Sequence, residues 1–330
     1  MAARLEVAPA APAPDLIDLR RLSSNNLDPL LDDEIREWRT ALDWDFGKSA
    51  DLVRRFVDLR ALSGCALMAA GETVGYSYFV VEEHKGLIGD LYVRPAWRTV
   101  ENETRLLTSV LEGVVTGSQV RRVEAQLMML LPGVPRAVPG SEFLTAHNRY
   151  FMLLDFDKER PPAEHSTRWR MHTERWSDHH QESAAQLIAA SYTGHIDSHI
   201  NDQYRSITGA RRFLYNIVQY PGCGTFFRSA SYVAIDIDDG DLCGLSLASI
   251  VGPESGHITQ ICVSPQVRGS GVGYELLRQS LVTLKDHGCR RVSLTVTGAN
   301  REAVELYRGI GFRTLRKFSA YVWEGFARRE

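Results

Sequence analysis

The sequence has no long apolar run, and this absence excludes one class of protein. No stretch of about 18 uninterrupted apolar residues occurs in the 330-residue chain, so no transmembrane helix is predicted. Residues 1–14 are rich in Ala and Pro and lack the continuous apolar core of a signal peptide. We therefore expect a disordered tail at residues 1–14 and a cytoplasmic protein with no membrane partner.

Paired cysteines and an excess of either charge are also lacking. The five cysteines are scattered, and no CxxC or Cys/His pair has the spacing of a zinc site. Four of them lie in or beside apolar runs, which predicts buried thiols and a reducing compartment: Cys223, Cys243, Cys262 and Cys289. The net charge of −3 offers no general basic surface to a nucleic acid, so none is expected as a partner.

What the sequence does contain is a glycine-rich turn between two apolar segments. An apolar run ends at Val263, a proline follows, and Arg268-Gly-Ser-Gly-Val-Gly273 precedes apolar residues at helical spacing. This order predicts a strand, a tight turn and a helix. The free amides at the start of such a helix favour an anion, and the glycines leave room for a phosphate to approach the backbone.

Two other phosphate-binding motifs fit this turn poorly. A P-loop requires a lysine after its last glycine, and none follows Gly273. A dinucleotide-binding fingerprint has the spacing GxGxxG and an acidic residue on a second strand. Here the spacing is GxGxG, and Asp286 lies within or at the end of the predicted helix.

A second segment follows about 30 residues after the first. Asn300-Arg-Glu-Ala-Val-Glu-Leu-Tyr307-Arg-Gly-Ile-Gly311-Phe312 comes after a β run at 292–296, and Asn300 can cap a helix that Gly311 ends. In this order, the two segments resemble motifs A and B of the GNAT superfamily of acyl-CoA N-acyltransferases. The resemblance covers roughly residues 165–323.

The resemblance implies a fold, a co-substrate and a set of residues that bind it. The implied fold is α/β, with a mixed, mostly antiparallel central sheet flanked by helices. Acetyl-CoA is the implied co-substrate; its pantetheine arm pairs with the exposed backbone of a splayed strand and its pyrophosphate sits on the glycine turn. No metal is expected. The implied coenzyme-binding residues are Ile261, Cys262, Val263, Val267, Arg268, Gly269, Ser270, Gly271, Val272, Gly273 and Asn300.

Two side chains are candidates for catalysis. Tyr307 stands where the family places a tyrosine that can protonate the leaving thiolate, and the alternative is a tyrosine buried for packing. A base for the amine is less clear, because Thr295 occupies the strand position where many members carry a glutamate. His257 lies six residues before Val263 and has a suitable side chain, although a histidine facing solvent or a chain of waters is an alternative.

The resemblance places the acceptor against the first helices of the C-terminal half. That region is rich in histidine, acids and tyrosine, and the candidate substrate-binding residues are Tyr192, His195, Asp197, His199 and Tyr204. The spacing His195-x-Asp197-x-His199 also admits a metal site, but no further ligand is spaced nearby and a polar loop explains it equally well.

The chain repeats itself at an offset of about 170 residues. Val93-Arg-Pro95 matches Val263-Ser-Pro265, and Arg98 matches Arg268, which predicts two tandem GNAT-like domains at 15–160 and 161–330. In the first domain the glycines become Thr99, Glu101 and Glu103, and the two carboxylates repel a diphosphate. We expect this domain to be degenerate, with a helix at Ser141–Leu154 that places Phe151 (or, after a slip of one residue, Tyr150) opposite Tyr307.

Two functions follow from these expectations. The first is an N-acetyltransferase that moves an acetyl group from acetyl-CoA directly to a primary amine of a small molecule or peptide. The second is a module that binds or senses acyl-CoA without turnover. The acceptor, the acyl length, the general base, the oligomeric state and any ligand of the N-terminal half stay open at this point.

Overall fold

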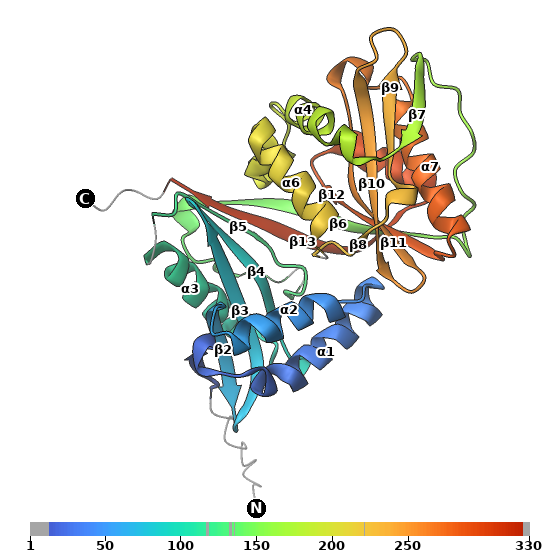
Figure 1. Ribbon diagram of the computed structural model, residues 1–330. Coiled ribbons are helices and arrows are strands. Elements are labelled where there is room, and N and C mark those ends of the chain that lie inside the picture. The colour runs from blue at the N-terminus through green and yellow to red at the C-terminus, as the bar shows by residue number, and fades with distance from the viewer. Residues whose placement is uncertain (1–12, 117–118, 132–133, 135, 221, 326–330) are drawn as a thin grey trace, which may run out of the picture.

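The computed structural model describes residues 13–116, 119–131, 134, 136–220 and 222–325. Residues 1–12 of the predicted tail lie outside this part of the chain. The chain forms two lobes that share one sheet, with helices packed against both lobes (Figure 1). Within the described residues, no helix is both long and apolar enough to cross a membrane.

The N-terminal lobe begins with a helical layer and continues as a sheet. Helix α1 starts at a capping box formed by Ser23 and Asn26, and its apolar face is fully buried at Leu27, Leu30 and Leu31. The elements of this lobe, in chain order, are β1 (Asp15–Asp18), α1 (Ser24–Leu42), α2 (Gly47–Asp58), β2 (Ser63–Ala69), β3 (Glu72–Glu82), β4 (Lys85–Val93), α3 (Val100–Thr116), β5 (Arg122–Gln126) and β6 (Leu144–Asp155).

The C-terminal lobe repeats the pattern of helices first and sheet second. Its elements are β7 (Met171–Arg175), α4 (Gln181–Ser191), α5 (Asp197–Ile200), α6 (Ile207–Gln219), β8 (Thr225–Phe226), β9 (Tyr232–Asp236), β10 (Leu242–Gly252), β11 (Ser255–Val263), α7 (Val272–Asp286), β12 (Arg291–Thr297), α8 (Arg301–Ile310) and β13 (Arg313–Glu324). The fold is therefore α/β and, as predicted, consists of two tandem units of similar topology.

The two units exchange their last strands. The strand order is β1-β2-β3-β4-β5-β13-β6-β12-β11-β10-β9-β7, so β6 of the first unit pairs with β12 of the second, and β13 pairs with β5 of the first. Strands β6 and β13 also pair with each other over most of their length and connect the lobes in Figure 1. The predicted boundary between residues 160 and 161 stays a prediction. Strand β6 precedes that boundary in the chain but pairs with β12 and β13 of the second unit.

The helix predicted at Ser141–Leu154 is wrong. A short 3-10 turn at Ser141–Phe143 leads into strand β6, which is hydrogen-bonded on both sides. Two partner strands, distant in the sequence, satisfy its backbone groups and override a local helical pattern. Phe151 and Tyr150 therefore lie on a strand, and no helix of the first unit corresponds to α8 among the described residues.

The loop between α1 and α2 fixes the two lobes to each other. Asp45 donates its backbone N–H to the carbonyl of Val251 (2.6 Å), and the Asp43 carboxylate lies 3.1 Å from Nε of Arg291. Trp44 packs edge-on against the His257 ring, with 4.9 Å between ring centroids. Side chains of the N-terminal lobe thereby reach the strands that carry the second unit's predicted site.

Candidate active site

The glycine turn has the predicted strand–turn–helix geometry. Strand β11 ends at Val263, a 3-10 turn follows at Pro265–Val267, and α7 begins after Gly271. Gly269 and Gly271 have φ angles of 72° and 93°, values that disfavour any side chain with a Cβ. Because the first amides of a helix have no partner within it, the turn presents N–H groups next to the positive end of α7.

A cavity of about 490 Å³ lies beside this turn. Its walls are Gly269, Ser270, Gly271, Tyr274 and residues of the segment 163–168. Arg168 in that segment donates from its backbone N–H to the Ser270 carbonyl (2.8 Å) and from its guanidinium to the Gly269 carbonyl (2.6 Å). Arg268 instead donates to the carbonyl of Ser191 (2.6 Å) and ties α4 to the turn.

Strand β11 separates from β12 where the resemblance expects a splay. Parallel pairing with β12 ends at Ile258↔Leu294, whereas antiparallel pairing with β10 continues to Val263. The β12-facing edge of Ile261, Cys262 and Val263 is therefore free of strand pairing, which leaves backbone groups for a ligand. Two carbonyls on this segment already accept side-chain hydrogen bonds: that of Val263 from Ser191 Oγ (3.0 Å) and that of Ile261 from Tyr192 OH (3.5 Å).

Helix α8 carries the second motif as predicted. The Asn300 side chain caps it by accepting from the Ala303 N–H (3.3 Å), and Gly311 ends it with a φ of 111°. Tyr307 lies on its buried face. Burial, reinforced by the charge of Asp197, raises the pKa of the Tyr307 hydroxyl. Within the described part of the chain, no hydrogen-bond partner is found for that hydroxyl, which borders the cavity described next.

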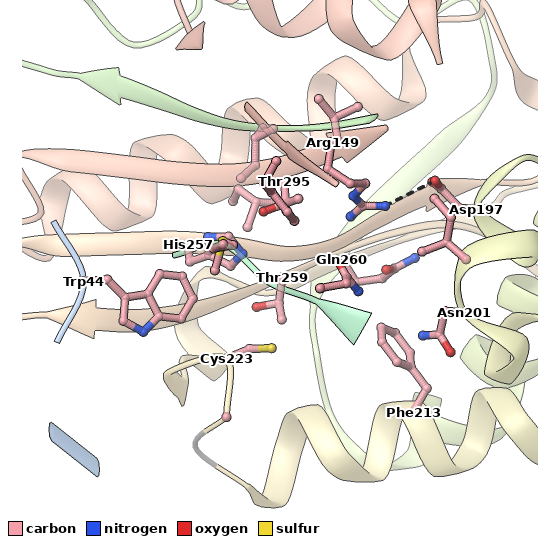
Figure 2. A pocket seen from close by; sticks show the side chains of 18 of the residues that line it. Trp44, Arg149, Asp197, Asn201, Phe213, Cys223, His257, Thr259, Gln260 and Thr295 are labelled. Carbon is pink, nitrogen blue, oxygen red and sulfur yellow. Dashed lines mark hydrogen bonds and ion pairs between the residues drawn. The ribbon is translucent and has the colours of Figure 1, made fainter. Parts of the chain in front are cut away.

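A cavity of about 520 Å³ lies between the two lobes. Its C-terminal walls include Tyr192, Asp197, Tyr204, His257, Asn300 and Tyr307. Its N-terminal walls include Trp38, Trp44, Phe46, Tyr78 and Asp90. Figure 2 shows Trp44 and His257 at one side of the view and Arg149 and Asp197 at the other. The site is thus enclosed by both lobes and not by the second unit alone.

Asp197 belongs to a polar cluster near Tyr307 that includes a residue the sequence did not reveal. Arg149 on β6 donates to Thr297 Oγ1 (2.9 Å) and lies 3.4 Å from Asp197 Oδ1 (Figure 2). The Thr297 hydroxyl in turn donates to Asp197. Arg149 was missed because its strand was predicted to be a helix of the other unit.

Three of the five predicted substrate residues line the cavity: Tyr192, Asp197 and Tyr204. The two tyrosine rings stack at 4.3 Å, and both hydroxyls hydrogen-bond to the Gln260 side chain, at 2.8 and 3.2 Å. His195 is not among the residues that line the cavity, and its Nδ1 accepts from the Asp197 N–H (3.2 Å). His199 is exposed. The substrate roles of these residues stay predictions.

Neither His195 nor His199 belongs to the one group of described residues whose geometry suits a metal. That group is Glu174, His179 and His180, at the start of α4. His180 there caps its own turn, accepting from the Ser177 N–H (3.0 Å) and contacting Glu174 Oε1 with Nε2 at 2.8 Å.

His257 borders the cavity but is poorly suited to take up a proton. Its ring packs against Trp44 and Phe151, and its Nδ1 lies 2.8 Å from Ser293 Oγ. Burial lowers the pKa of His257 to about 3, because the packed aromatic rings cannot solvate an imidazolium. Its role as general base stays a prediction, and its surroundings do not favour it.

Comparison with known proteins agrees with this geometry. Residues 198–312 match the model of the acetyltransferase (GNAT) family. A tandem GNAT protein of the clavulanic acid biosynthesis pathway superposes with a TM-score of 0.60 at 16% identity, covering 95% of this chain and 99% of that protein. Residues 198–312 therefore match the GNAT family, and the chain as a whole has the fold of a tandem GNAT protein.

Curated GNAT relatives match only part of the chain. The thialysine N-epsilon-acetyltransferase of Sus scrofa is 32% identical over 77 residues, 22% of this chain and 45% of that protein. The mycothiol acetyltransferase of Corynebacterium jeikeium is 30% identical over 70 residues, 21% of this chain and 20% of that protein. The matches thus span less than half of each relative's length.

The corresponding turn of the first GNAT-like unit is filled by protein. Glu103 is 1% exposed; it accepts from the Leu131 N–H (2.9 Å) and pairs with Nη1 of Arg136 (2.7 Å). Arg98, the counterpart of Arg268, forms a two-pronged ion pair with Glu37 at 2.6 Å for each bond. Glu101 is exposed, so the turn is closed by one of the two carboxylates noted in the sequence and not by both.

The prediction of a buried thiol fails at Cys223. This residue is exposed in the loop between α6 and β8, where it lines the cavity between the two lobes (Figure 2). It follows Gly222 in a short irregular segment, so the neighbouring apolar residues do not enclose it. Cys243 and Cys289 are buried, and Cys262 is half-buried.

Proposed function

We propose that this protein is an acetyl-CoA-dependent N-acetyltransferase whose C-terminal unit carries the reaction. The observation that carries the proposal is the free edge of β11 beyond Ile258, which lies between the open glycine turn and Tyr307. An extended pantetheine arm fits such an edge by backbone hydrogen bonding, and a diphosphate fits the amides of the turn. Arg168 adds a cation beside the turn.

Tyr307 is suited to act as the acid in direct acetyl transfer. The amine nitrogen attacks the thioester carbonyl carbon, the new C–N bond replaces the C–S bond, and the departing thiolate takes up a proton. Tyr307 lines the cavity, and because burial raises the pKa of its hydroxyl, the hydroxyl is protonated at neutral pH. It can therefore give its proton to the sulfur and recover one from solvent.

The proton that the amine loses needs a different acceptor. Because burial lowers the pKa of His257 to about 3, that imidazole would hold the extra proton only weakly. We infer that the amine reacts as the free base and that its proton passes to water in the cavity. The rate should then rise with pH until the acceptor amine is fully deprotonated.

The acceptor is proposed to be a small molecule. The names of the relatives point to amine acceptors of two kinds, free small molecules and, for a Bacillus subtilis protein 34% identical over 84 residues, the alanine of a ribosomal protein. A cavity of about 520 Å³ walled by both lobes suits a small ligand better than a polypeptide chain.

The test is release of free thiol from acetyl-CoA in the presence of a panel of primary amines, with mass spectrometry of the product. We expect thiol release above the uncatalysed rate with at least one amine, and one acetyl group on nitrogen in the product. Binding of acetyl-CoA without turnover on any amine would contradict the proposal and favour a module that senses acyl-CoA.

A further inference from the structure

The N-terminal lobe gives the cavity a second polar region, far from Tyr307 along the sheet. Asp90 on β4 and Leu294 on β12 both line the cavity, and β5, β13 and β6 lie between their strands. Four strand spacings of about 4.8 Å therefore separate β4 from β12. A ligand that reacts beside Tyr307 can reach Asp90 only with another part of the molecule.

Asp90 is a carboxylate without a counter-ion. Its side chain is almost fully buried at 7% exposure; Oδ1 accepts from the Leu91 N–H (2.7 Å), and apart from a proton on the neighbouring Glu34 carboxyl, Oδ2 has no donor among the described residues. The neighbouring carboxyl of Glu34 is fully buried and accepts from Tyr76 OH (2.9 Å) and Trp38 Nε1 (3.2 Å). Within the described ranges, neither acid pairs with a lysine or arginine, which is costly unless a cation arrives from outside.

Aromatic rings surround the same part of the cavity. Trp38 stacks on Phe46 with 4.9 Å between centroids, and both line the cavity. Tyr78 also lines it and lies over Gly89, where a Cβ would meet the Tyr78 ring at 2.2 Å. Gly89 thus allows the ring to form part of the wall next to Asp90. A carboxylate among aromatic rings is an arrangement that proteins use to bind organic cations.

We propose that the part of the cavity formed by Trp38, Phe46, Tyr78 and Asp90 binds a cationic group of the acceptor, which is therefore a small molecule with a second amino group. This inference rests on the proposed function only in treating the bound molecule as the acetyl acceptor. Asp90 is the counter-ion, and the aromatic rings hold the ammonium group by cation–π attraction. The first unit, though closed to coenzyme, would then select the acceptor.

The probes are linear α,ω-diamines of four to twelve carbons and the monoamines of the same lengths, titrated calorimetrically without acetyl-CoA. We expect at least one diamine to bind about tenfold or more tightly than its monoamine. Asp90→Asn should weaken the binding of that diamine about tenfold or more. Asp236→Asn is the matched control, because Asp236 is equally buried at 8% but lies outside the cavity, where it accepts from Trp169.

Proton release provides a second readout that a purely structural carboxyl pair would not produce. Burial and the charge of Asp90 raise the pKa of Glu34 well above its usual range, which favours a proton held by the acid pair. A bound ammonium group favours the ionised pair, and titrations in buffers of different ionisation enthalpy should report release of up to about one proton. The other titratable or charged groups near the pair are Tyr76, Tyr78, Tyr92, Glu37 and Arg98.

The outcomes separate this inference from the proposed function. Equal affinity for diamines and monoamines at every length, with no proton release in the wild type, would overturn it even if Asp90→Asn failed to fold. Thiol release at the same KM with both amine classes would also overturn it while the acetyltransferase proposal stands. Selective diamine binding that Asp90→Asn abolishes, without thiol release, would support the cation site and contradict the proposed function.

Discussion

The two strand–turn–helix segments of this protein share a backbone plan and differ in what fills the turn. β4 leads through a 3-10 turn at Pro95–Trp97 to α3, just as β11 leads through Pro265–Val267 to α7. In the second segment the turn is Gly269–Gly271 and borders a cavity, whereas in the first the Glu103 side chain is buried at the start of α3 in an ion pair with Arg136. The same backbone plan therefore borders an open cavity in one unit and holds a buried ion pair in the other.

The ends of β4 and β11, where each strand separates from its parallel neighbour, also differ between the two units. Parallel pairing stops at Ile88↔Ala125 in the first unit and at Ile258↔Leu294 in the second. Beyond that point the second unit exposes the backbone edge of β11, while in the first unit Asp90 lines the central cavity. A unit whose turn lacks the glycines can thus still contribute the end of its β4 strand to the wall of the central cavity.

The largest effect should come from removing the proposed acid, Tyr307, which has no counterpart on a helix of the first unit among the described residues. Tyr307→Phe should lower kcat by about 10²–10⁴-fold, because the leaving thiolate loses its proton donor. Affinity for acetyl-CoA should stay within about twofold, since the hydroxyl is expected to act on the reacting sulfur. Steady-state kinetics and calorimetry measure the two quantities.

The matched control for this change is Tyr150→Phe on β6. The sequence comparison places this tyrosine opposite Tyr307 after a slip of one residue. The Tyr150 ring packs near Gly298 and under the Lys317 ammonium, outside the cavity. Its loss should leave kcat unchanged. If both variants behave alike, Tyr307 packs the core and does not act as the acid.

The next effect concerns the closed turn of the first unit. Glu103→Gln should lower the free energy of unfolding by about 3 kcal/mol, because Arg136 is left buried without its counter-charge. Urea unfolding measures this, with the exposed Glu101→Gln expected to stay within about 0.5 kcal/mol of the wild type. A stable Glu103→Gln protein that gains a second acetyl-CoA site would show that the carboxylate alone keeps the first turn closed to coenzyme.

The smallest predicted effect concerns His257 and pH. Burial lowers its folded-state pKa to about 3, below the ordinary value of about 6.5, so below pH 6.5 the unfolded chain binds a proton that the folded chain does not. Stability should therefore fall as the pH falls, by about 1.4 kcal/mol between pH 7.5 and 5.5 from this group. Urea unfolding of His257→Gln at the two pH values should lack that component.

An exposed histidine provides the comparison for this prediction. His172 lies in solvent on β7, and His172→Gln should leave the pH dependence of stability as in the wild type. An unchanged pH dependence in His257→Gln would mean that the imidazole gains a proton in the folded state, and the general-base hypothesis would gain support.

The sequence predicted local features well and long-range pairing poorly. The glycine turn, the Asn300 cap and the end of α8 at Gly311 depend on residues within a few positions of each other, and all were confirmed. The strand exchange was not predicted, because β6 and β13 pair with segments far away in the chain. Arg149 and Asp90 were missed for the same reason. Both lie in segments assigned to the first unit, whereas the site was predicted from residues of the second unit alone.

The account depends most on the claim that only the second unit binds coenzyme, and calorimetric titration with acetyl-CoA tests it directly. We predict one site per chain, weakened at least about 100-fold in Gly271→Glu, because a carboxylate then meets the diphosphate. Gly240→Glu is the matched control, since Gly240 has a similar φ of 80° in a turn with open space around it. Two sites per chain, or equal binding by both variants, would contradict the account.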